Sequence, residues 1–291
     1  MAKQVTTETI RKFYNTGKKI TMLTCYDYST GKMLDAAGID CVLVGDSLAM
    51  VALGYDTTHK IGIDEMKIFT RAVAKGVSRA LTITDMPFMS YHTSVEDAAK
   101  NAGELIKAGA KAVKIEGGNE YIISVVKHLT NIGIPVVAHL GFTPQFMHAL
   151  GGYKIQGKDF DKTLNILEQA KKLEEAGAFM LVLEMVPSQA AEFITKNINI
   201  PTIGIGAGVN TSGQVLVIDD ILGKYSNFTP KFARKYADIY STTENAIKKY
   251  IEDVENCDFP SKTETFELDN EEIEKLDGYS YSQDKRIKSN N

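Results

Sequence analysis

The chain has 291 residues, of which 44% are hydrophobic and 24% are charged, as expected for a globular protein with a large core. The 33 Lys and Arg against 37 Asp and Glu give a formal net charge of −4, which excludes a generally basic nucleic-acid-binding protein. The N-terminal segment lacks the apolar stretch of a signal peptide, and no apolar run approaches the roughly 20 residues that span a bilayer. The three cysteines include no CxxC pair. We therefore expect a cytoplasmic protein without nucleic-acid or membrane partners.

Short β-branched runs alternate with longer helical patterns along most of the chain. The runs predict eight strands, at 20–24, 41–44, 81–84, 112–115, 135–138, 179–183, 202–205 and 215–218. The segments between them predict helices at 29–37, 63–78, 95–108, 121–131, 162–176 and 188–197. The strand candidates are almost continuously apolar, which is typical of parallel strands that are buried on both faces.

Several of the predicted helices end in Ala-Gly, and a strand follows at once. The pairs at 37–38, 108–109 and 176–177 show this pattern, and Gly just after a helix is the usual left-handed stop. Such a return to a strand completes a βαβ unit, and these units join into parallel sheets with right-handed connections. Eight of them predict a closed (β/α)8 barrel, with a doubly wound open sheet as the alternative.

The end of the chain has a different composition. From residue 261 onward it is rich in Glu, Lys, Asn, Asp and Ser and contains few apolar residues. A segment of this kind cannot bury enough apolar surface to offset the entropy of ordering. We therefore expect a loosely held and partly disordered extension.

Acidic residues follow four of the predicted strands: Asp46, Asp85, Glu116 and Glu184. In a parallel barrel these strand ends meet at one mouth, where catalytic groups lie. Any one such acid is better explained as a helix N-cap or a surface residue. Three on successive strands, Asp46, Asp85 and Glu116, repel one another unless a cation lies between them. Mg²⁺ is the plainest candidate because it prefers oxygen ligands, and Mn²⁺ or Co²⁺ are alternatives.

Three further residues at this mouth have both a functional and a structural interpretation. Lys114 lies two residues before Glu116, so both share one face of the strand. Lys114 either neutralises the acid in an ion pair or binds a substrate carboxylate or enolate. Glu184 has apolar neighbours and suits proton transfer, unless it only precedes a helix. His139 ends the fifth predicted strand and is either a catalytic residue or a buried polar one.

A glycine-rich segment, 204–208, follows the seventh predicted strand. Loops after the seventh and eighth strands of barrels often bind phosphate. A single motif of this kind is weak evidence, and glycines equally serve a tight turn, which is the interpretation that we favour.

Many ordered motifs together resemble the ketopantoate hydroxymethyltransferase family. They include VGDSL (44–48), TDMPFMSY (84–91), VKIEGG (113–118), LEMVP (183–187) and IGIGAG (203–208). The resemblance extends over residues 3–266 with few gaps. It implies a (β/α)8 barrel of the phosphoenolpyruvate/pyruvate type at 1–266, followed by a polar extension at 267–291 beyond the common core of the family.

The resemblance also implies an activity. The family transfers a hydroxymethyl group from 5,10-methylenetetrahydrofolate to 3-methyl-2-oxobutanoate through a Mg²⁺-stabilised enolate. The product is 2-dehydropantoate, a precursor in pantothenate biosynthesis. Family members are Mg²⁺-dependent cytoplasmic enzymes that assemble as homodecamers.

Residues at the predicted barrel mouth acquire roles from this resemblance. It implies that the metal ligands are Asp46, Asp85 and Glu116. It implies that the keto acid is bound by Asp46, Ser47, Asp85 and Lys114. The implied proton acceptor is Glu184, and the implied active-site histidine is His139.

Two other functions remain open from the sequence. Another Mg²⁺-dependent enzyme of 2-oxo acids, a carbon–carbon lyase or mutase on the same barrel, would share the metal and the enolate but not the folate. Such enzymes usually need a loop with a reactive cysteine or a phosphate-binding site, and neither is evident here. A barrel that only binds a metabolite is the other alternative, although binding alone does not require a proton acceptor beside a metal.

Overall fold

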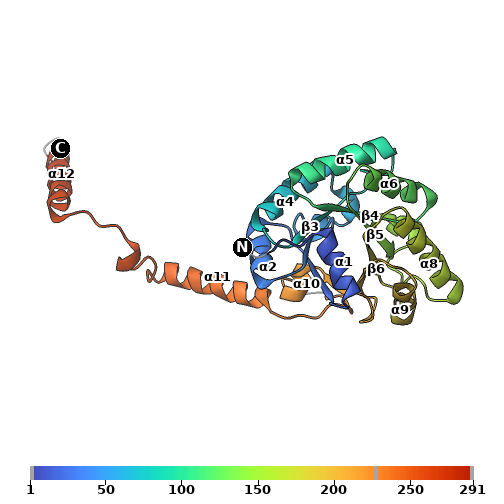
Figure 1. The fold of residues 1–291 in the computed structure, drawn as a ribbon. Helices are drawn as coiled ribbons and strands as arrows, with labels where there is room; N and C mark the ends of the chain where they lie inside the picture. Colours follow the sequence, from blue (N-terminus) through green and yellow to red (C-terminus); the bar gives the residue numbers. More distant parts are fainter. Residues whose placement is uncertain (1–2, 226–228, 289–291) are drawn as a thin grey trace. The chain divides into compact units, whose positions relative to one another are not determined.

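The computed structural model describes residues 3–225 and 229–288, and the chain divides into two compact units, Met1–Ala237 and Asp238–Asn291. The first unit is a closed barrel in which all neighbouring strands pair in parallel, in chain order (Figure 1). Its strands are β1 (Ile20–Thr24), β2 (Cys41–Val44), β3 (Leu81–Asp85), β4 (Ala112–Glu116), β5 (Val136–Gly141), β6 (Met180–Glu184), β7 (Thr202–Ile205) and β8 (Gly213–Leu216). The predicted (β/α)8 barrel is confirmed, and the open sheet is excluded.

Helices connect the strands and surround the barrel (Figure 1). Those of the first unit are α1 (Thr7–Asn15), α2 (Tyr28–Ala37), α3 (Leu48–Val51), α4 (Ile63–Gly76), α5 (Val95–Ala108), α6 (Glu120–Asn131), α7 (Met147–Leu150), α8 (Phe160–Glu175), α9 (Ser188–Lys196) and α10 (Ile218–Leu222). Two short 3₁₀ helices, η1 (Thr58–Lys60) and η2 (Pro144–Phe146), lie in its loops. Gly38 and Gly109 end α2 and α5 in the left-handed conformation, as predicted.

The eighth strand lies two residues earlier than predicted. Gly213 pairs with Ile20 of β1, and Leu216 pairs with Leu23, whereas Ile218 already begins α10. The apolar run at 215–218 spans the end of the strand and the start of the helix. Periodicity cannot divide so short a run between the two elements.

The strand side chains alternate between the interior of the barrel and the layer under the helices. In β4, Ala112 belongs to the interior cluster, whereas Val113 and Ile115 pack with the helices. Since successive side chains on a strand point to opposite faces, Lys114 and Glu116 face the interior with Ala112. The residues two positions before Asp85, His139 and Glu184 also belong to the interior cluster. The barrel therefore directs these side chains inward.

Helix α1 packs against the amino-terminal end of the barrel. Val5 and the fully buried Ile10 belong to the same cluster as Ile20, Leu81 and Ala112, each of which is the first residue of its strand. This apolar contact closes one end of the interior. The carboxyl ends of the strands are consequently the open mouth.

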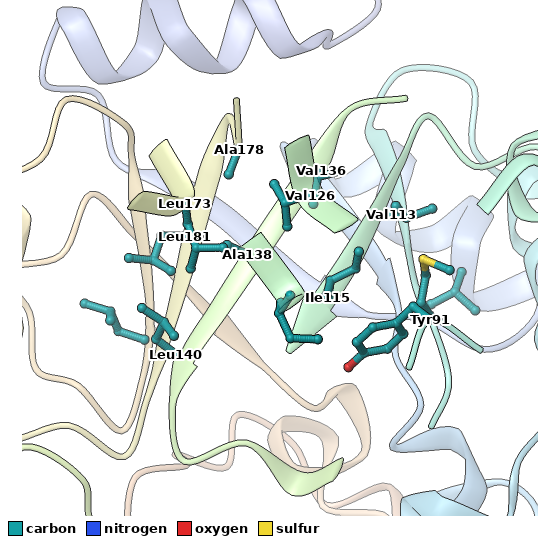
Figure 2. Packing of buried hydrophobic residues seen from close by; sticks show 14 of the residues in the cluster. Tyr91, Val113, Ile115, Val126, Val136, Ala138, Leu140, Leu173, Ala178 and Leu181 are labelled. Carbon is teal, nitrogen blue, oxygen red and sulfur yellow. The ribbon is translucent and has the colours of Figure 1, made fainter. Parts of the chain in front are cut away.

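The outer layer of the core fills the space between the strands and the helices. Figure 2 shows part of it, with Ile115 and Ala138 from the strands beside Val126 of α6 and Leu173 of α8. These four side chains are buried. Each Å² of buried apolar surface contributes about 25 cal/mol to the stability of the fold, so this layer stabilises the packing of the strands against the helices.

The second unit contains α11 (Ile239–Glu255), η3 (Lys262–Glu264) and α12 (Asn270–Lys288). Helix α11 buries none of its residues in the structure. The expected domain end at 266 stays a prediction; the unit boundary falls at 237, and the last buried hydrophobic residue before it is Ile218 in α10. Part of the expected polar extension, 267–291, is helical, and its partial disorder stays a prediction.

Two expectations from composition concern membranes and cysteines. Across 3–225 and 229–288, every helix is too short or too polar to cross a membrane. The three cysteines are free thiols; Cys25 and Cys41 are buried and Cys257 is exposed.

Candidate active site

A pocket of about 670 Å³ opens at the carboxyl ends of the strands. It gathers every site residue that the sequence analysis singled out, although they come from separate strands. The lining includes Asp46, Ser47, Asp85, Lys114, Glu116, His139 and Glu184. The predicted convergence at one barrel mouth agrees with this arrangement.

Strand endings position most of these side chains. Asp85, Glu116 and Glu184 are the last residues of β3, β4 and β6. His139 lies inside β5 and not at its end as predicted, because the ladder continues to Gly141, which pairs with Glu184. His139 still faces the pocket, because it lies two residues after Val137, whose side chain points into the barrel interior.

Lys114 is the central cation of the pocket. Its Nζ lies 2.8 Å from Asp85 Oδ1 and 3.6 Å from Glu116 Oε1, and all three residues are buried. Burial lowers the pKa of Lys114, but Asp85 and Glu116 outweigh this effect and raise it above its ordinary value. Lys114 therefore stays charged, and it serves as the counter-ion of two carboxylates.

His139 lies between two carboxylates. Its Nδ1 is 3.3 Å from Glu116 Oε1, and its Nε2 is 3.4 Å from Glu184 Oε2 without hydrogen-bond geometry. Burial and nearby Lys114 lower the pKa of His139, but Glu116 and Glu184 outweigh both and raise it to about 9. An imidazolium here compensates acidic charge and links the proton acceptor candidate Glu184 to the other acids.

The third acid is the least compensated. Burial together with Asp85 and Glu116 raises the pKa of Asp46 well above its ordinary value. The backbone N–H of Asp46 donates to Asp85 Oδ2 at 3.0 Å, so the two acids are direct neighbours. The pocket therefore has an excess of acidic groups close to Asp46, and a bound cation would relieve it.

Ser47 is the N-cap residue of the short helix α3 and follows Asp46 in the chain. Its hydroxyl is 2.9 Å from the hydroxyl of Tyr26, a buried residue on the loop after β1. Sequence reasoning missed Tyr26, because it follows no acidic or glycine motif. Tyr26 holds the Ser47 side chain at the pocket.

Sequence reasoning also missed Gln145, which lies in η2 after β5. Its side-chain amide donates to Asp46 Oδ2 at 2.9 Å, and its backbone N–H donates to Glu116 Oε2 at 3.0 Å. The signal for it was the segment Thr143-Pro144-Gln145, which belongs to the family resemblance and to which no role was assigned.

The glycine-rich segment at 204–208 contains the last two residues of β7, Gly204 and Ile205, and the chain bends directly after them. Gly206 and Gly208 have φ values of 62° and 81°, a region that favours glycine. A Cβ on Gly208 would lie 2.5 Å from the Ser188 side chain. These features agree with the turn interpretation.

The acids do not form a ready-made cage. Among the residues that the structure describes, no group of three or more His, Cys, Asp or Glu side chains is arranged to hold a metal. Lys114, His139 and Gln145 lie against oxygens of these acids. The three-ligand set stays a prediction.

Comparison with known proteins decides the family. The family model described as ketopantoate hydroxymethyltransferase matches residues 4–262. The chain belongs to the ketopantoate hydroxymethyltransferase family. Membership in this family makes it an enzyme of the transferase class, as the motifs indicated.

Curated relatives are similar over nearly their whole length. A 3-methyl-2-oxobutanoate hydroxymethyltransferase of Clostridium novyi (strain NT) is 51% identical over 272 residues, which cover 93% of this chain and 98% of the relative. One of Enterococcus faecalis (strain ATCC 700802 / V583) is 50% identical over 260 residues, which cover 89% and 94%. These relatives favour the ketopantoate hydroxymethyltransferase reaction over the alternative lyase or mutase.

Solved structures support the barrel type. A phosphonopyruvate hydrolase in complex with oxalate and Mg²⁺ has a TM-score of 0.59 at 12% identity and covers 97% of this chain and 96% of its own. A 2,3-dimethylmalate lyase of the phosphoenolpyruvate mutase/isocitrate lyase superfamily has a TM-score of 0.56 at 12% identity and covers 97% and 98%. At this identity the likeness shows the fold alone, a (β/α)8 barrel that this member of the ketopantoate hydroxymethyltransferase family shares.

Proposed function

We propose that this chain transfers a hydroxymethyl group from 5,10-methylenetetrahydrofolate to 3-methyl-2-oxobutanoate, which yields 2-dehydropantoate for pantothenate biosynthesis. The names of relatives about half identical to it support the acceptor and the transfer. The folate donor rests on the family resemblance. The observation that carries the chemistry is the placement of Glu184 in one buried pocket with Lys114 and three further acids.

We propose Mg²⁺ as the cofactor, held by Asp46, Asp85 and Glu116. The donor set fits, because all three are buried carboxylates. Asp85 Oδ1 is buried without a hydrogen bond, although Lys114 Nζ lies nearby. Mg²⁺ in proteins usually takes one or two carboxylates and completes its shell with water and substrate, so a three-residue cage is not required.

The bound cation would polarise the keto group of the substrate and make its C3–H more acidic. Glu184 lies at the edge of the pocket, and its side chain is 16% exposed, so it can reach a substrate and accept the C3 proton. Lys114 stabilises the negative charge that develops on the keto oxygen. Ser47 binds the substrate carboxylate.

The deciding experiment is an assay with purified protein, 3-methyl-2-oxobutanoate and methylenetetrahydrofolate, with and without Mg²⁺. We expect the purified protein to form 2-dehydropantoate only when both substrates and Mg²⁺ are present. Cleavage of a 2-oxo acid without folate would favour the lyase, and binding without turnover would favour a metabolite-binding barrel.

We further propose a cytoplasmic homodecamer, which rests on the resemblance alone. Sedimentation velocity of the purified protein tests the assembly. A single species of about ten times 32.0 kDa is expected, and a monomer or dimer contradicts it.

A further inference from the structure

The loop after β5 carries a residue that touches two of the acids at once. We infer that Gln145 is a positioning residue, which orients the carboxylates of Asp46 and Glu116 for cation binding. The inference deepens the proposed function, on which it rests for the identity of the cation. Its own subject is the orientation of the carboxylates.

The contacts of Gln145 join separate strands. Its Nε2 donates to Asp46 Oδ2, after β2, and to the backbone oxygen of Met86, after β3, both at 2.9 Å. Its backbone N–H donates to Oε2 of Glu116, the last residue of β4, at 3.0 Å. Gln145 is 3% exposed, so water cannot replace these bonds. One residue therefore holds one oxygen of each of two acids.

The orientation of the Gln145 amide follows from its partners. The Met86 carbonyl oxygen can only accept a hydrogen bond, and Gln145 faces it and Asp46 Oδ2 with the same amide atom. The group that faces both must be the NH₂ group. The amide oxygen, Oε1, consequently needs a donor on its other side.

Tyr91 supplies that donor. Its hydroxyl lies 2.7 Å from Gln145 Oε1 and accepts a hydrogen bond from the backbone N–H of Glu116 at 3.2 Å. A tyrosine hydroxyl has one proton, and Gln145 Oε1 at 2.7 Å is a closer acceptor for it than the Glu116 carbonyl oxygen at 3.4 Å. Tyr91 is fully buried in the outer core layer, where Figure 2 shows it near Ile115. The amide is thus fixed from the packed core.

The backbone of Gln145 is fixed as well. His59 Nε2 lies 2.9 Å from the Gln145 carbonyl oxygen. The N–H of Phe146 donates to the Thr143 carbonyl at 2.9 Å, which closes the η2 turn. The oxygen and the nitrogen of the Gln145 amide and the backbone of Gln145 all have hydrogen-bond partners, so the side chain has one available orientation. Such a group can impose a geometry on the acids that it touches.

The consequence for ligand binding concerns the remaining oxygens. Asp46 Oδ2 and Glu116 Oε2 are engaged by Gln145. Asp46 keeps its second oxygen, Oδ1, for the pocket, whereas Glu116 Oε1 faces His139 Nδ1 at 3.3 Å and Lys114 Nζ at 3.6 Å. Without the amide, the Asp46 carboxylate can rotate about its χ2 torsion. Cation binding must then also order this side chain, and the lost entropy weakens the binding.

The test replaces Gln145 with Met, which has a similar length and no hydrogen-bond donor. Mn²⁺ binding is measured by electron paramagnetic resonance, with Mn²⁺ alone and with added 3-methyl-2-oxobutanoate. We expect Q145M to weaken Mn²⁺ binding roughly 10–100-fold, the usual range for residues that orient metal ligands. We also expect saturating Mg²⁺ to restore most of kcat. Gln189→Met, at an exposed site in α9, is the matched control and should bind Mn²⁺ as the wild type does.

Tyr91→Phe provides a second variant that leaves the Gln145 amide hydrogens in place. It removes the donor to Oε1 and should weaken Mn²⁺ binding roughly 10-fold. If Q145M does not fold, the result for Y91F decides. A folded Q145M or Y91F with wild-type Mn²⁺ affinity overturns the inference, as does a wild type that binds no Mn²⁺ in either condition. Mn²⁺ binding that depends on Gln145 in a protein without hydroxymethyl transfer would keep the inference and refute the proposed function.

Discussion

Lys114 and Asp85 form a buried ion pair at the centre of the pocket, with Nζ 2.8 Å from Oδ1. The two residues come from the adjacent strands β3 and β4 and are register partners in the ladder. An ion pair withdrawn from water stabilises a fold little by itself, because the loss of hydration offsets the attraction. Removing one partner is costly, since the other charge is left buried. This asymmetry gives the first prediction.

Lys114→Met should lower the free energy of unfolding by about 3–5 kcal/mol when no divalent cation is present. The loss should be smaller in Mg²⁺, because a bound cation replaces part of the missing charge. Urea denaturation with EDTA and with Mg²⁺ measures both. Lys196→Met breaks an exposed pair with Glu192 and should leave stability nearly unchanged. Equal effects of the two substitutions would contradict a central role for the Lys114 charge.

Glu184→Gln should almost abolish the removal of the C3 proton while Mg²⁺ and keto-acid binding persist. The amide keeps the size of the side chain but cannot accept a proton at neutral pH. Exchange of deuterium at C3 of 3-methyl-2-oxobutanoate, followed by NMR, isolates this step from folate chemistry. A variant that exchanges at the wild-type rate removes Glu184 from its proposed role.

Asp85→Asn should weaken metal binding and activity together. The substitution removes one negative charge and leaves the partner Lys114 in place, so the site loses affinity for a cation. Calorimetric titration with Mg²⁺ and turnover at several Mg²⁺ concentrations measure the two effects. Activity that survives both EDTA and this substitution would show that the reaction needs no divalent metal.

The barrel and most of its site were predictable because both follow from local patterns. Buried parallel strands are apolar runs, and the acids that end them must meet at one mouth. Lys114 and Glu116 share a face because they are two residues apart. The pocket lining bears out this geometry.

Other features depend on contacts that no local pattern encodes. Gln145 meets Asp46, which lies 99 positions away, only through the path of the loop after β5. The strand β5 runs past His139 because its ladder continues to Gly141 against β6. Helix α1 was not predicted. Its apolar face that packs on the barrel consists of Ile10 and Phe13, and its other residues are mostly polar.

Asp35 predicts a pH dependence of stability away from the site. Burial raises its pKa, but hydrogen bonds from the N–H of Ala80 and from Ser78 outweigh this effect, so the pKa lies below its ordinary value. A carboxyl whose folded pKa is lowered stabilises the fold above its unfolded pKa, near 4, and loses this contribution as the pH falls through the folded value.

Asp35→Ala should therefore cost about 1–2 kcal/mol at pH 7, and the difference from the wild type should shrink below about pH 4. Urea denaturation of both proteins at pH 7, 5 and 3 measures it. A difference that stays constant with pH would mean that Asp35 acts through helix packing and not through its charge.

Truncation after Phe266 should leave the barrel intact. The buried hydrophobic residues of the described chain all precede α11, and the last of them is Ile218. Residues 267–279 are exposed, so we expect that removing 267–291 changes the free energy of unfolding by less than about 0.5 kcal/mol. Thermal unfolding followed by circular dichroism measures it. A matched truncation after Val217 also removes Ile218 and α10, which opens the core, and it should abolish cooperative unfolding. Loss of cooperativity in the shorter deletion would show that the tail contributes to the fold of the barrel.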